Sequence, residues 1–444
     1  MDQNRIDDLK RRSKNARPRG FSRSPLAVGV ALLSLGALAG CDALDQLLEV
    51  EAPSRVIARD MEDPAAAQLL VESVGNEFRC AFTHYVNVSG LVGWELRSVQ
   101  NGGTQVFYDG RTWTTGGYGS GSYAGADCES GNAALYLPLS RSRWFADEML
   151  GRLDEWGEAQ VPNKTELEAR AAAWAGYSYL LMGESMCSVA FDNGPEQSVE
   201  DALGLAIDRF QRAMAAAESS GQSDFLNLAR IGTGRALLNL GQVADAGNAV
   251  ADVPEDFTFE LEYSALNDAT HNRQYRSNQR DENVGIGERY LDMTFDGVPD
   301  PRVPVTDEGR TVAGYGVPLW TTSKYSSLDA PVRLAGWPEA ALIMAEAALA
   351  DNRPEDAVSL INELHDRADL PDFESSDEEE IMDQIVYERR AELFLESHHL
   401  MDMKRYDLPL HPAPGEPFPF GGLYGSSTCF PLPDTERFNN PNLS

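Results

Sequence analysis

Apolar residues recur at helical spacing along most of the chain, and long interruptions separate the periodic stretches. The first stretch begins at Asp63-Pro64, where Asp63 is the expected N-cap and Pro64 takes the first helical position. The apolar spacing from Leu69 to Phe78 continues this helix. Further helices are predicted over residues 132–156, 164–186, 196–219, 224–251 and 377–407. The pattern therefore predicts a mainly α-helical protein.

Two long segments lack helical periodicity. Residues 90–131 are rich in Gly, Ser, Thr and aromatic residues, and residues 257–331 are rich in Asn, Asp, Gly and Pro. Irregular segments of this length in compact proteins are usually functional. We expect a long loop in the first segment, and loops with short strands on one side of the helical body in the second.

Three of the helical stretches resemble one another, at residues 172–183, 229–241 and 340–352. Each reads small residue, aliphatic pair, then Gly or Asn, and an amphipathic helix follows. Small residues allow close helix contact, and Gly or Asn makes a tight turn. The pattern predicts a superhelix of degenerate tetratricopeptide-type helix pairs, interrupted by insertions because the intervals are unequal.

Residues 377–407 are predicted to form one long helix. Acidic residues fill its first turn, and Lys404 and Arg405 lie near its end, so charge complements the helix dipole at both termini. Charged residues lie at helical spacing among its apolar residues, which indicates a mostly buried helix whose charges are paired internally. The expected structural ion-pair residues are Glu388, Arg389, Glu392, Glu396, Asp402 and Arg405.

The motif Glu388-Arg389-Arg390-x-Glu392-Leu393-x-x-Glu396, followed by Asp402-x-x-Arg405, resembles the late helix of the SusD/RagB lipoproteins. The resemblance extends to Asp300-Pro301-Arg302, to Lys324-Tyr325, to residues 333–347 and to residues 430–443. It covers the chain closely from about Asp300 to the end, and the N-terminal half only in pattern. Ser397 and His399 stand where the family usually has a glycine and an arginine, so we expect a different turn at the end of this helix.

The resemblance implies a single SusD-like helical domain over residues 60–444, with insertions at about 90–131 and 257–331. It implies a non-catalytic surface lipoprotein that binds a nutrient, with an oligosaccharide as the expected ligand. Such a protein delivers the nutrient to a SusC-like TonB-dependent outer-membrane transporter. The alternative function is a periplasm-facing helical-repeat scaffold for protein assembly, and a hydrolase is the third and weakest hypothesis.

The N-terminus has the pattern of a lipoprotein signal peptide. Basic residues precede an apolar stretch over residues 26–39, which is too short to span a membrane comfortably and ends in Leu38-Ala39-Gly40-Cys41. Small residues before a cysteine are what signal peptidase II requires. We expect residues 1–40 to be removed, Cys41 to be lipidated and residues 41–59 to tether the body to the outer membrane, at the cell surface. Asp42 leaves the choice of membrane open.

Four cysteines remain once Cys41 is acylated. An even number in an exported protein indicates disulfides, and the spacings lack the paired C-x-x-C of a zinc site. Of the three possible pairings we favour Cys80–Cys128, which would tie the long loop to its helix. The second bond is then Cys187–Cys429, which would tether the C-terminal tail to the helical body.

The chain is strongly acidic, with a net charge of −33. Residues 1–40 carry eight Lys and Arg against three Asp, a balance of +5, which leaves −38 on the residues from Cys41 onward. This charge argues against nucleic acid or anionic lipid as a partner and favours a neutral or cationic ligand.

Catalytic and metal-binding signatures are absent from the sequence, which contains no G-x-S-x-G, Walker, H-E-x-x-H or EF-hand motif. We therefore predict no catalytic residue, cofactor or metal. His398 and His399 are adjacent, so on a helix their rings diverge by about 100° and do not converge on one metal. Glu388, Glu392 and Glu396 resemble the carboxylates of a glycosidase, but the arginines beside them favour a structural role.

The irregular segments supply aromatic rings, and sugars present apolar C–H faces that stack on such rings. The candidate ligand-binding residues are Trp94, Asn101, Trp113, Tyr118, Tyr123, Trp320 and Tyr325. The alternative is that these rings hold the loop against the helices beneath it. For any single ring the two interpretations are equal, and for the set a binding surface is favoured.

Overall fold

The computed structural model describes residues 60–116, 123–125, 127–128, 132–312 and 314–443. All of them lie in one compact unit that spans Ile57–Ser444. The expected signal peptide, Cys41, the tether and Tyr118 lie outside the described residues.

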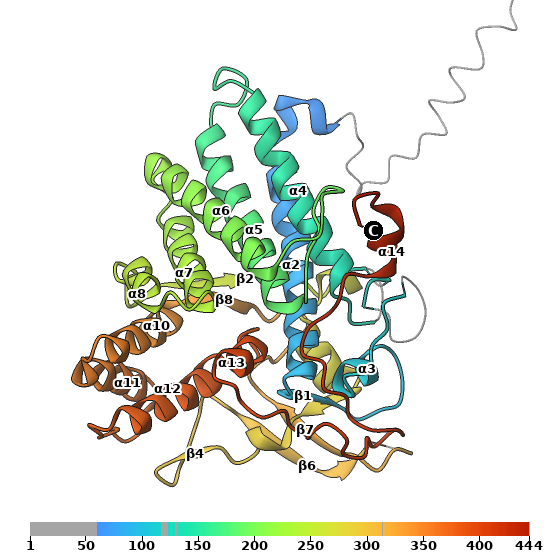
Figure 1. Cartoon of the computed structure of the whole chain (residues 1–444), viewed down its shortest axis with the longest axis vertical. Helices are drawn as coiled ribbons and strands as arrows, with labels where there is room; N and C mark the ends of the chain where they lie inside the picture. Colours follow the sequence, from blue (N-terminus) through green and yellow to red (C-terminus); the bar gives the residue numbers. More distant parts are fainter. Residues whose placement is uncertain (1–59, 117–122, 126, 129–131, 313, 444) are drawn as a thin grey trace, which may run out of the picture. The chain divides into compact units, whose positions relative to one another are not determined.

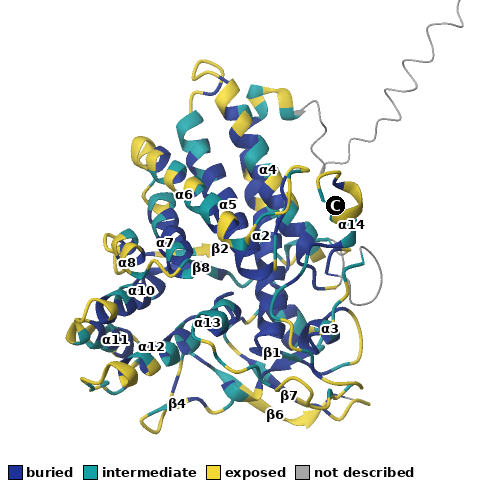
Figure 2. Ribbon diagram, in the orientation of Figure 1, coloured by how far each residue is buried: buried dark blue, intermediate teal, exposed yellow. Residues whose placement is uncertain are grey.

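The first long helix, α2 (Ala67–Val92), begins as the sequence predicts. The Asp63 carboxylate accepts a hydrogen bond from the Ala65 backbone N–H at 2.9 Å, and Pro64 opens a 3-10 turn (Pro64–Ala66) that leads into the helix. From Cys80 to Val92 every residue of α2 is buried, and Figure 2 shows this helix running through the interior. α2 is therefore the element on which the other layers pack.

The remaining long helices form a series of antiparallel neighbours (Figure 1). They are α4 (Tyr136–Glu155), α5 (Lys164–Ser185), α6 (Val199–Ser220), α7 (Ser223–Asn239), α8 (Val243–Val250), α10 (Trp337–Ala350), α11 (Pro354–Ala368) and α12 (Glu378–Glu392). Each packs on the next, and α8 packs on α10 across the long insertion. The body is thus a superhelix of helix pairs, as the repeats predict.

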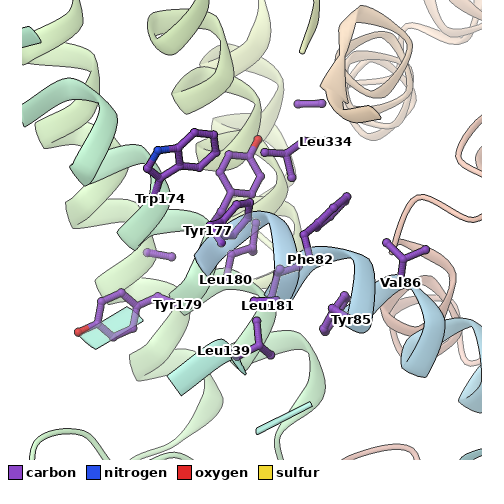
Figure 3. Packing of buried hydrophobic residues seen from close by; sticks show 14 of the residues in the cluster. Phe82, Tyr85, Val86, Leu139, Trp174, Tyr177, Tyr179, Leu180, Leu181 and Leu334 are labelled. Carbon is purple, nitrogen blue, oxygen red and sulfur yellow. The ribbon is translucent and has the colours of Figure 1, made fainter. Parts of the chain in front are cut away.

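The core is aromatic and continuous where α2, α4 and α5 meet. Phe82 and Tyr85 of α2 pack among Tyr177 and Leu181 of α5, with Leu139 of α4 beside them (Figure 3). All five side chains are at most 1% exposed. Burying residues of this size contributes about 1.5–3 kcal/mol each relative to exposure, so this junction anchors the fold.

Short strands and small helices lie outside the helix pairs. Within the part of the chain that the structure describes, the strands form four two-stranded antiparallel sheets: β1 (Leu96–Ser98) with β3 (Val284–Ile286), β2 (Thr258–Leu261) with β8 (Val332–Gly336), β4 (Thr294–Phe295) with β5 (Val298–Pro299), and β6 (Val305–Thr311) with β7 (Pro318–Thr322). The small helices are α3 (Gln105–Asp109), α9 (Arg273–Tyr275), α13 (His399–Arg405) and α14 (Asp434–Asn439). The insertion at 257–331 therefore contains loops and short strands, as predicted.

The single helix predicted over residues 224–251 is wrong, because the chain turns at Gly241, where φ is +74°, and forms two helices. The repeat pattern predicted this turn at Gly241, but the turn that it predicted at Gly183 is wrong. Gly183 makes no turn. It lies inside α5, where a Cβ would come within 2.9 Å of the Leu203 side chain, so its role is close packing against α6. Asn352, with φ at +55°, does make the turn predicted for it.

The prediction of one helix over residues 377–407 is also wrong, because the structure has two helices there with a break between them. α12 ends at Glu392 and α13 begins at His399, and between them Leu395 and Ser397 have φ of +55° and +77°. Tyr325 donates its hydroxyl to the Leu395 carbonyl at 3.1 Å, which holds the turn from outside the segment. The periodic pattern could not reveal this break, since the same apolar face continues across it. Ser397 occupies a left-handed position that suits the glycine of the family.

Candidate ligand-binding face

Three segments meet at the edge of the body where β1, α3 and the β6–β7 hairpin lie (Figure 1). Arg97 of β1 lies over the Trp320 ring of β7, with its guanidinium carbon 3.9 Å from the ring centroid, and donates to the Pro318 carbonyl at 2.9 Å. Arg111, just after α3, donates to the Gly425 carbonyl at 2.7 Å. The two arginines therefore fasten the hairpin and the C-terminal segment 411–425 to the same support.

A group of rings lies on this support, which we call the aromatic cluster: Tyr315, Phe418, Phe420 and Tyr424. Their centroids are linked edge to face, at 5.8 Å between Tyr315 and Phe420, 5.4 Å between Phe418 and Phe420, and 5.0 Å between Phe418 and Tyr424. Tyr315 is 43% exposed and the neighbouring Leu423 is 57% exposed, whereas Tyr424 is buried. The cluster thus has a rigid base and an accessible apolar surface.

Polar side chains lie on the two strands of the hairpin whose turn carries Tyr315. Asp307, Glu308 and Arg310 of β6 are exposed, and the Thr321 hydroxyl of β7 donates to Glu308 at 2.6 Å. Sugars need this combination, an apolar surface for the ring faces and donors and acceptors for the hydroxyls. The face therefore has the chemistry of a carbohydrate contact surface.

Four of the seven predicted ligand-binding residues are buried. Trp94, Tyr123, Trp320 and Tyr325 are 4%, 0%, 7% and 4% exposed. Trp94 packs edge-on against His411 with centroids 4.4 Å apart. Their burial favours the alternative in which aromatic rings hold the irregular segments to the body.

The other three predicted ligand-binding residues are not buried or lie outside the described residues. Asn101 is exposed, and Trp113 is half-buried and stacks on Phe430 with centroids 4.2 Å apart. Tyr118 lies outside the described residues. A ligand contact by these three residues stays a prediction.

The aromatic cluster itself was missed by the sequence analysis. Three of its rings come from residues 411–425, a stretch of Pro, Gly and aromatic residues without helical periodicity. This composition is the same signal that marked residues 90–131 as a functional segment, so it was available in the sequence.

Both predicted disulfides are present. Cys80 of α2 bonds Cys128, across 48 residues, and Cys187 bonds Cys429, across 242 residues. Next to the second disulfide, the Cys187 N–H donates a backbone hydrogen bond to the Phe430 carbonyl at 2.8 Å. The C-terminal tail that follows the aromatic cluster is thereby tied to the end of α5.

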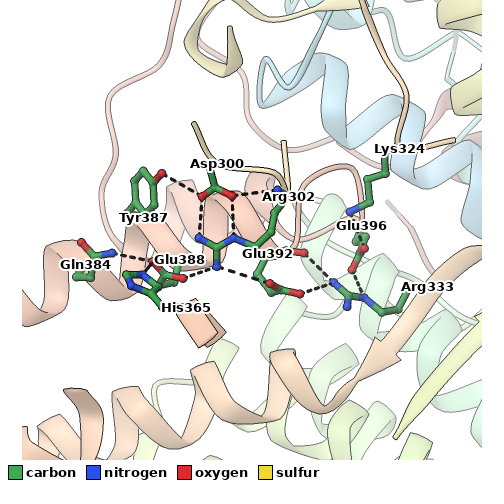
Figure 4. Close-up of polar contacts among 10 residues, drawn as sticks. All are labelled: Asp300, Arg302, Lys324, Arg333, His365, Gln384, Tyr387, Glu388, Glu392 and Glu396. Carbon is green, nitrogen blue, oxygen red and sulfur yellow. Dashed lines mark hydrogen bonds and ion pairs between the residues drawn. The ribbon is translucent and has the colours of Figure 1, made fainter. Parts of the chain in front are cut away.

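The expected ion-pair residues lie in a network of charged side chains (Figure 4). Arg302 pairs with the Asp300 carboxylate at 2.7 Å and with Glu388 of α12 at 2.5 Å, and both carboxylates are 0% exposed. Glu388 also contacts His365 Nε2 at 2.8 Å, and Gln384 donates to it at 2.7 Å. Glu388 is therefore surrounded by donors.

Glu392 and Glu396 are held in the same way (Figure 4). Arg333 contacts Glu392 at 3.1 Å and Glu396 at 2.8 Å, and Lys324 contacts Glu396 at 2.7 Å. Burial alone would raise the pKa of Glu396, but Arg333 and Lys324 outweigh it and hold the pKa below its ordinary value. A carboxylate in this state is ionised and fully engaged, which suits structure and not proton transfer.

The last part of the network joins α12, α13 and α10. Arg389 pairs with Asp402 at 2.9 Å, and Arg405 contacts both Asp402, at 3.5 Å, and Glu346 of α10. All six predicted ion-pair residues thus have charged partners. Because the carboxylates of the network are bound by cations, the structure favours the structural interpretation of this helix over the glycosidase one.

His398 and His399 point to different partners. His398 Nε2 lies 3.0 Å from the Glu339 carboxylate, whereas the His399 ring lies edge-on to Tyr290 with centroids 6.0 Å apart. No group of three or more potential metal ligands occurs within the described residues. None of the helices among the described residues is long and apolar enough to cross a bilayer.

Two buried acidic residues, Glu95 and Asp109, have carboxyl groups whose pKa is raised. Glu95 and Asp109 are each 1% exposed, and burial raises the pKa of each to about 7. Glu95 accepts a hydrogen bond from the Leu395 N–H at 2.8 Å, so it supports the turn between α12 and α13. Asp109 accepts one from the Ser98 N–H at 2.7 Å.

We expect Glu95→Gln to stabilise the protein at high pH only. Between about pH 4 and pH 7 the unfolded chain has lost a proton that folded Glu95 retains, so wild-type stability falls as pH rises through this window. At pH 8 the variant should be more stable by about 3 kcal/mol, because an amide keeps the acceptor for Leu395 without a buried charge. At pH 5 the two proteins should unfold alike. Thermal unfolding at pH 5, 6, 7 and 8 measures this, and an equal offset at every pH would contradict it.

Comparison with known proteins supports the fold and the family resemblance. Residues 320–440 match the model of the SusD family. A SusD-like carbohydrate binding protein from Bacteroides vulgatus has a TM-score of 0.65 at 16% identity, covering 86% of this chain and 97% of its own. A laminarin binding SusD-like protein has a TM-score of 0.61 at 14% identity, with 86% and 98% covered.

A SusD superfamily protein from Parabacteroides distasonis gives a TM-score of 0.63 at 11% identity, with 88% of this chain and 99% of that chain covered. No curated protein matches the sequence. The predicted resemblance to the SusD family and the predicted tetratricopeptide-like fold are confirmed.

Proposed function

We propose that this SusD-like chain is a non-catalytic, lipid-anchored protein of the outer membrane that binds an oligosaccharide. It delivers that oligosaccharide to a TonB-dependent transporter of the SusC type. The observation that carries the ligand class is the aromatic cluster, in which Tyr315 is exposed on the same hairpin as the exposed polar side chains of β6. Two of the proteins that share the fold are described as binding carbohydrate or laminarin, which supports a sugar as the ligand.

The non-catalytic part of the proposal rests on the state of the acidic residues. The carboxylates of Glu388 and Glu396 are at most 4% exposed and bound by cations, and Glu95 and Asp109 are buried beneath the face. A glycosidase needs two carboxyl groups facing an open substrate cleft. None of these four carboxyl groups faces such a cleft, since each is at most 3% exposed.

Retardation in native gels that contain a polysaccharide tests the ligand class. We expect wild-type protein to be retarded by at least one neutral polysaccharide, with laminarin, amylopectin, xylan and galactomannan as the probes. Pectin and alginate serve as acidic counterparts, and the charge of −33 predicts weaker retardation by them. Equal mobility of the wild type in all of these gels would contradict the proposal.

Tyr315→Ala should weaken binding of the polysaccharide that retards the wild type. Loss of one stacking ring lowers the binding free energy by about 1 kcal/mol, which corresponds to roughly a fivefold rise in the dissociation constant. Phe438→Ala is the matched control, because Phe438 is an aromatic residue 83% exposed on α14 and outside the aromatic cluster. Affinities come from the mobility at graded polysaccharide concentrations. Equal effects of the two substitutions would show that the cluster is not the contact surface.

The anchoring part of the proposal concerns residues outside the described structure. We propose that residues 1–40 are the signal peptide, that Cys41 carries the lipid and that residues 41–59 are the tether. Cys41→Ser should release the protein from the membrane fraction. Protease treatment of intact cells should digest the wild-type protein, and wild-type protein that is soluble or shielded would contradict the placement.

A further inference from the structure

Trp144 is an exposed tryptophan, and the packing of the body does not explain its place at the surface. All seven tryptophans lie among the described residues, and Trp144 is 47% exposed. Trp113 is half-buried, and the remaining five are 7% exposed or less. An exposed indole forgoes the stabilisation that burial would give, and tryptophan is enriched at the residues that dominate protein interfaces.

Trp144 lies in a groove on the outer side of α4 with a volume of about 450 Å³. Glu148, Gly151, Arg152 and Glu155 line the same groove. These positions are four, seven, eight and eleven residues after Trp144, so they share one face of the helix. Their spacing places Gly151 about 10 Å along the helix axis from the indole.

Gly151 keeps the groove open. A Cβ built at Gly151 would meet no atom within 4 Å, so neither packing nor backbone conformation requires glycine there. Glycine inside a helix costs about 1 kcal/mol relative to alanine. The sequence therefore carries a helix-weakening residue in the lining of the groove, where a larger side chain would take up part of its volume.

The polar groups of the groove are positioned before any ligand arrives. Arg152 contacts Glu148 at 3.1 Å and Glu155 at 3.4 Å, along the helix. At the other end, Arg143 donates to both carboxylate oxygens of Asp192, at 2.9 Å and 2.8 Å, and is itself 4% exposed. Paired side chains of this kind lose little conformational freedom when they accept or donate a further hydrogen bond.

The lining favours a neutral, hydroxyl-rich ligand. Four carboxylates and two guanidinium groups line the groove, which disfavours an anionic ligand. A protein partner is disfavoured as well, because the core of a protein interface is apolar and poor in charge, and Trp144 is the single large apolar residue in the lining. A sugar fits all three features: a ring face for the indole, hydroxyls for the ion pairs and no net charge.

We propose that the α4 groove at Trp144 is a second oligosaccharide-binding site, separate from the aromatic cluster. The ligand class rests on the function proposed above. α4 carries no residue of the aromatic cluster, which lies on the β6–β7 hairpin and the 411–425 segment at the other end of the view in Figure 1. Two sites on one molecule increase the retention of a long glycan through avidity without any new contact at either site.

Trp144→Ala and Gly151→Leu test this proposal. The first removes the stacking surface, and the second adds a bulky side chain to the groove at a position where an added Cβ meets no atom within 4 Å. Each is expected to raise the polysaccharide concentration needed for half-retardation by at least threefold in the gels described above. Alanine at Gly151 is the matched control, because it removes the glycine yet adds only one methyl group, and it should retain the mobility of the wild type.

Indole accessibility gives a second, direct measurement on the wild-type protein. Trp144 is the most exposed tryptophan, so it dominates the emission that acrylamide quenches. Saturation with the retarding polysaccharide should reduce this quenching in the wild type, and Tyr315→Ala should leave the reduction in place. Trp144→Phe should abolish the reduction.

The outcomes distinguish a failure of the second site from a failure of the proposed oligosaccharide-binding function. Retardation that is lost in Tyr315→Ala but unchanged in Trp144→Ala and Gly151→Leu overturns the second site and leaves the first. No retardation of the wild type by any of the polysaccharides overturns both. Loss of retardation in Gly151→Ala to the same degree as in Gly151→Leu would show that the loss does not follow from filling the groove, and would overturn the second site.

Discussion

Arg302→Ala is expected to lower the free energy of unfolding by about 3–5 kcal/mol, which is a large part of the stability of a typical domain. The Asp300 and Glu388 carboxylates that Arg302 joins are both 0% exposed, and the substitution leaves both buried without their main cation. His365 and Tyr387 remain as hydrogen-bond partners and offset only part of the loss. Chemical denaturation and expression level measure the effect.

Arg310→Ala is the matched control for this experiment. Arg310 makes a bidentate contact with Glu282 through two nitrogens, at 3.0 Å and 2.5 Å, but its side chain is 46% exposed. Solvent screens such a pair, so its loss should leave the unfolding midpoint almost unchanged. If Arg302→Ala were as stable as Arg310→Ala, the buried network would not be what holds α12 in place. A folded Arg302→Ala protein that had also lost a measurable hydrolase activity would restore the catalytic interpretation of Glu388.

Phe430→Ala is expected to lower the free energy of unfolding by about 3–5 kcal/mol, because it leaves a cavity at a buried site where three segments meet. Phe430 is 0% exposed, and its ring contacts Trp113, Tyr108 and Tyr123 at centroid distances of 4.2, 5.9 and 5.0 Å. The substitution therefore loosens the C-terminal tail and the irregular segment 90–131 together. Thermal unfolding and proteolysis of the tail report the two effects.

Phe438→Ala provides the comparison for Phe430→Ala. The two residues have the same side chain and lie in the same C-terminal tail, but Phe438 is 83% exposed. A surface substitution of this kind changes stability by about 0.5 kcal/mol or less. Equal destabilisation by both would mean that the tail does not pack on the body through Phe430, and would leave the Cys187–Cys429 disulfide as its main attachment.

The helices, disulfides and ion pairs could be predicted because each leaves a local pattern or an identifiable set of partners in the sequence. Helical periodicity and the Asp63-Pro64 start located α2, and export with four remaining cysteines favoured the correct pairs. The charged motif of α12 predicted buried pairs, but not that Arg302, Arg333 and Lys324 supply the cations. Those partners come from distant segments, and periodicity carries no information about them.

The ligand-binding face was predicted poorly because exposure depends on tertiary packing. Trp94 and Trp320 have the residue type expected of a sugar platform, yet the body covers both. Trp144 follows a helical pattern and reads from the sequence as one more residue of α4, although 47% of its surface is exposed. Aromatic composition thus identifies segments that contact one another as readily as surfaces that contact a ligand.

Calorimetric titration of the purified chain with oligosaccharides from the polysaccharide that retards it, followed by sizing of the recovered sugars, distinguishes binding from hydrolysis in one experiment. We expect saturable binding, weakened by Tyr315→Ala but not by Phe438→Ala, and oligosaccharides of unchanged length after prolonged incubation with the protein. Shortened oligosaccharides, or the absence of saturable binding to every sugar tested, would contradict a protein that binds carbohydrate without cleaving it.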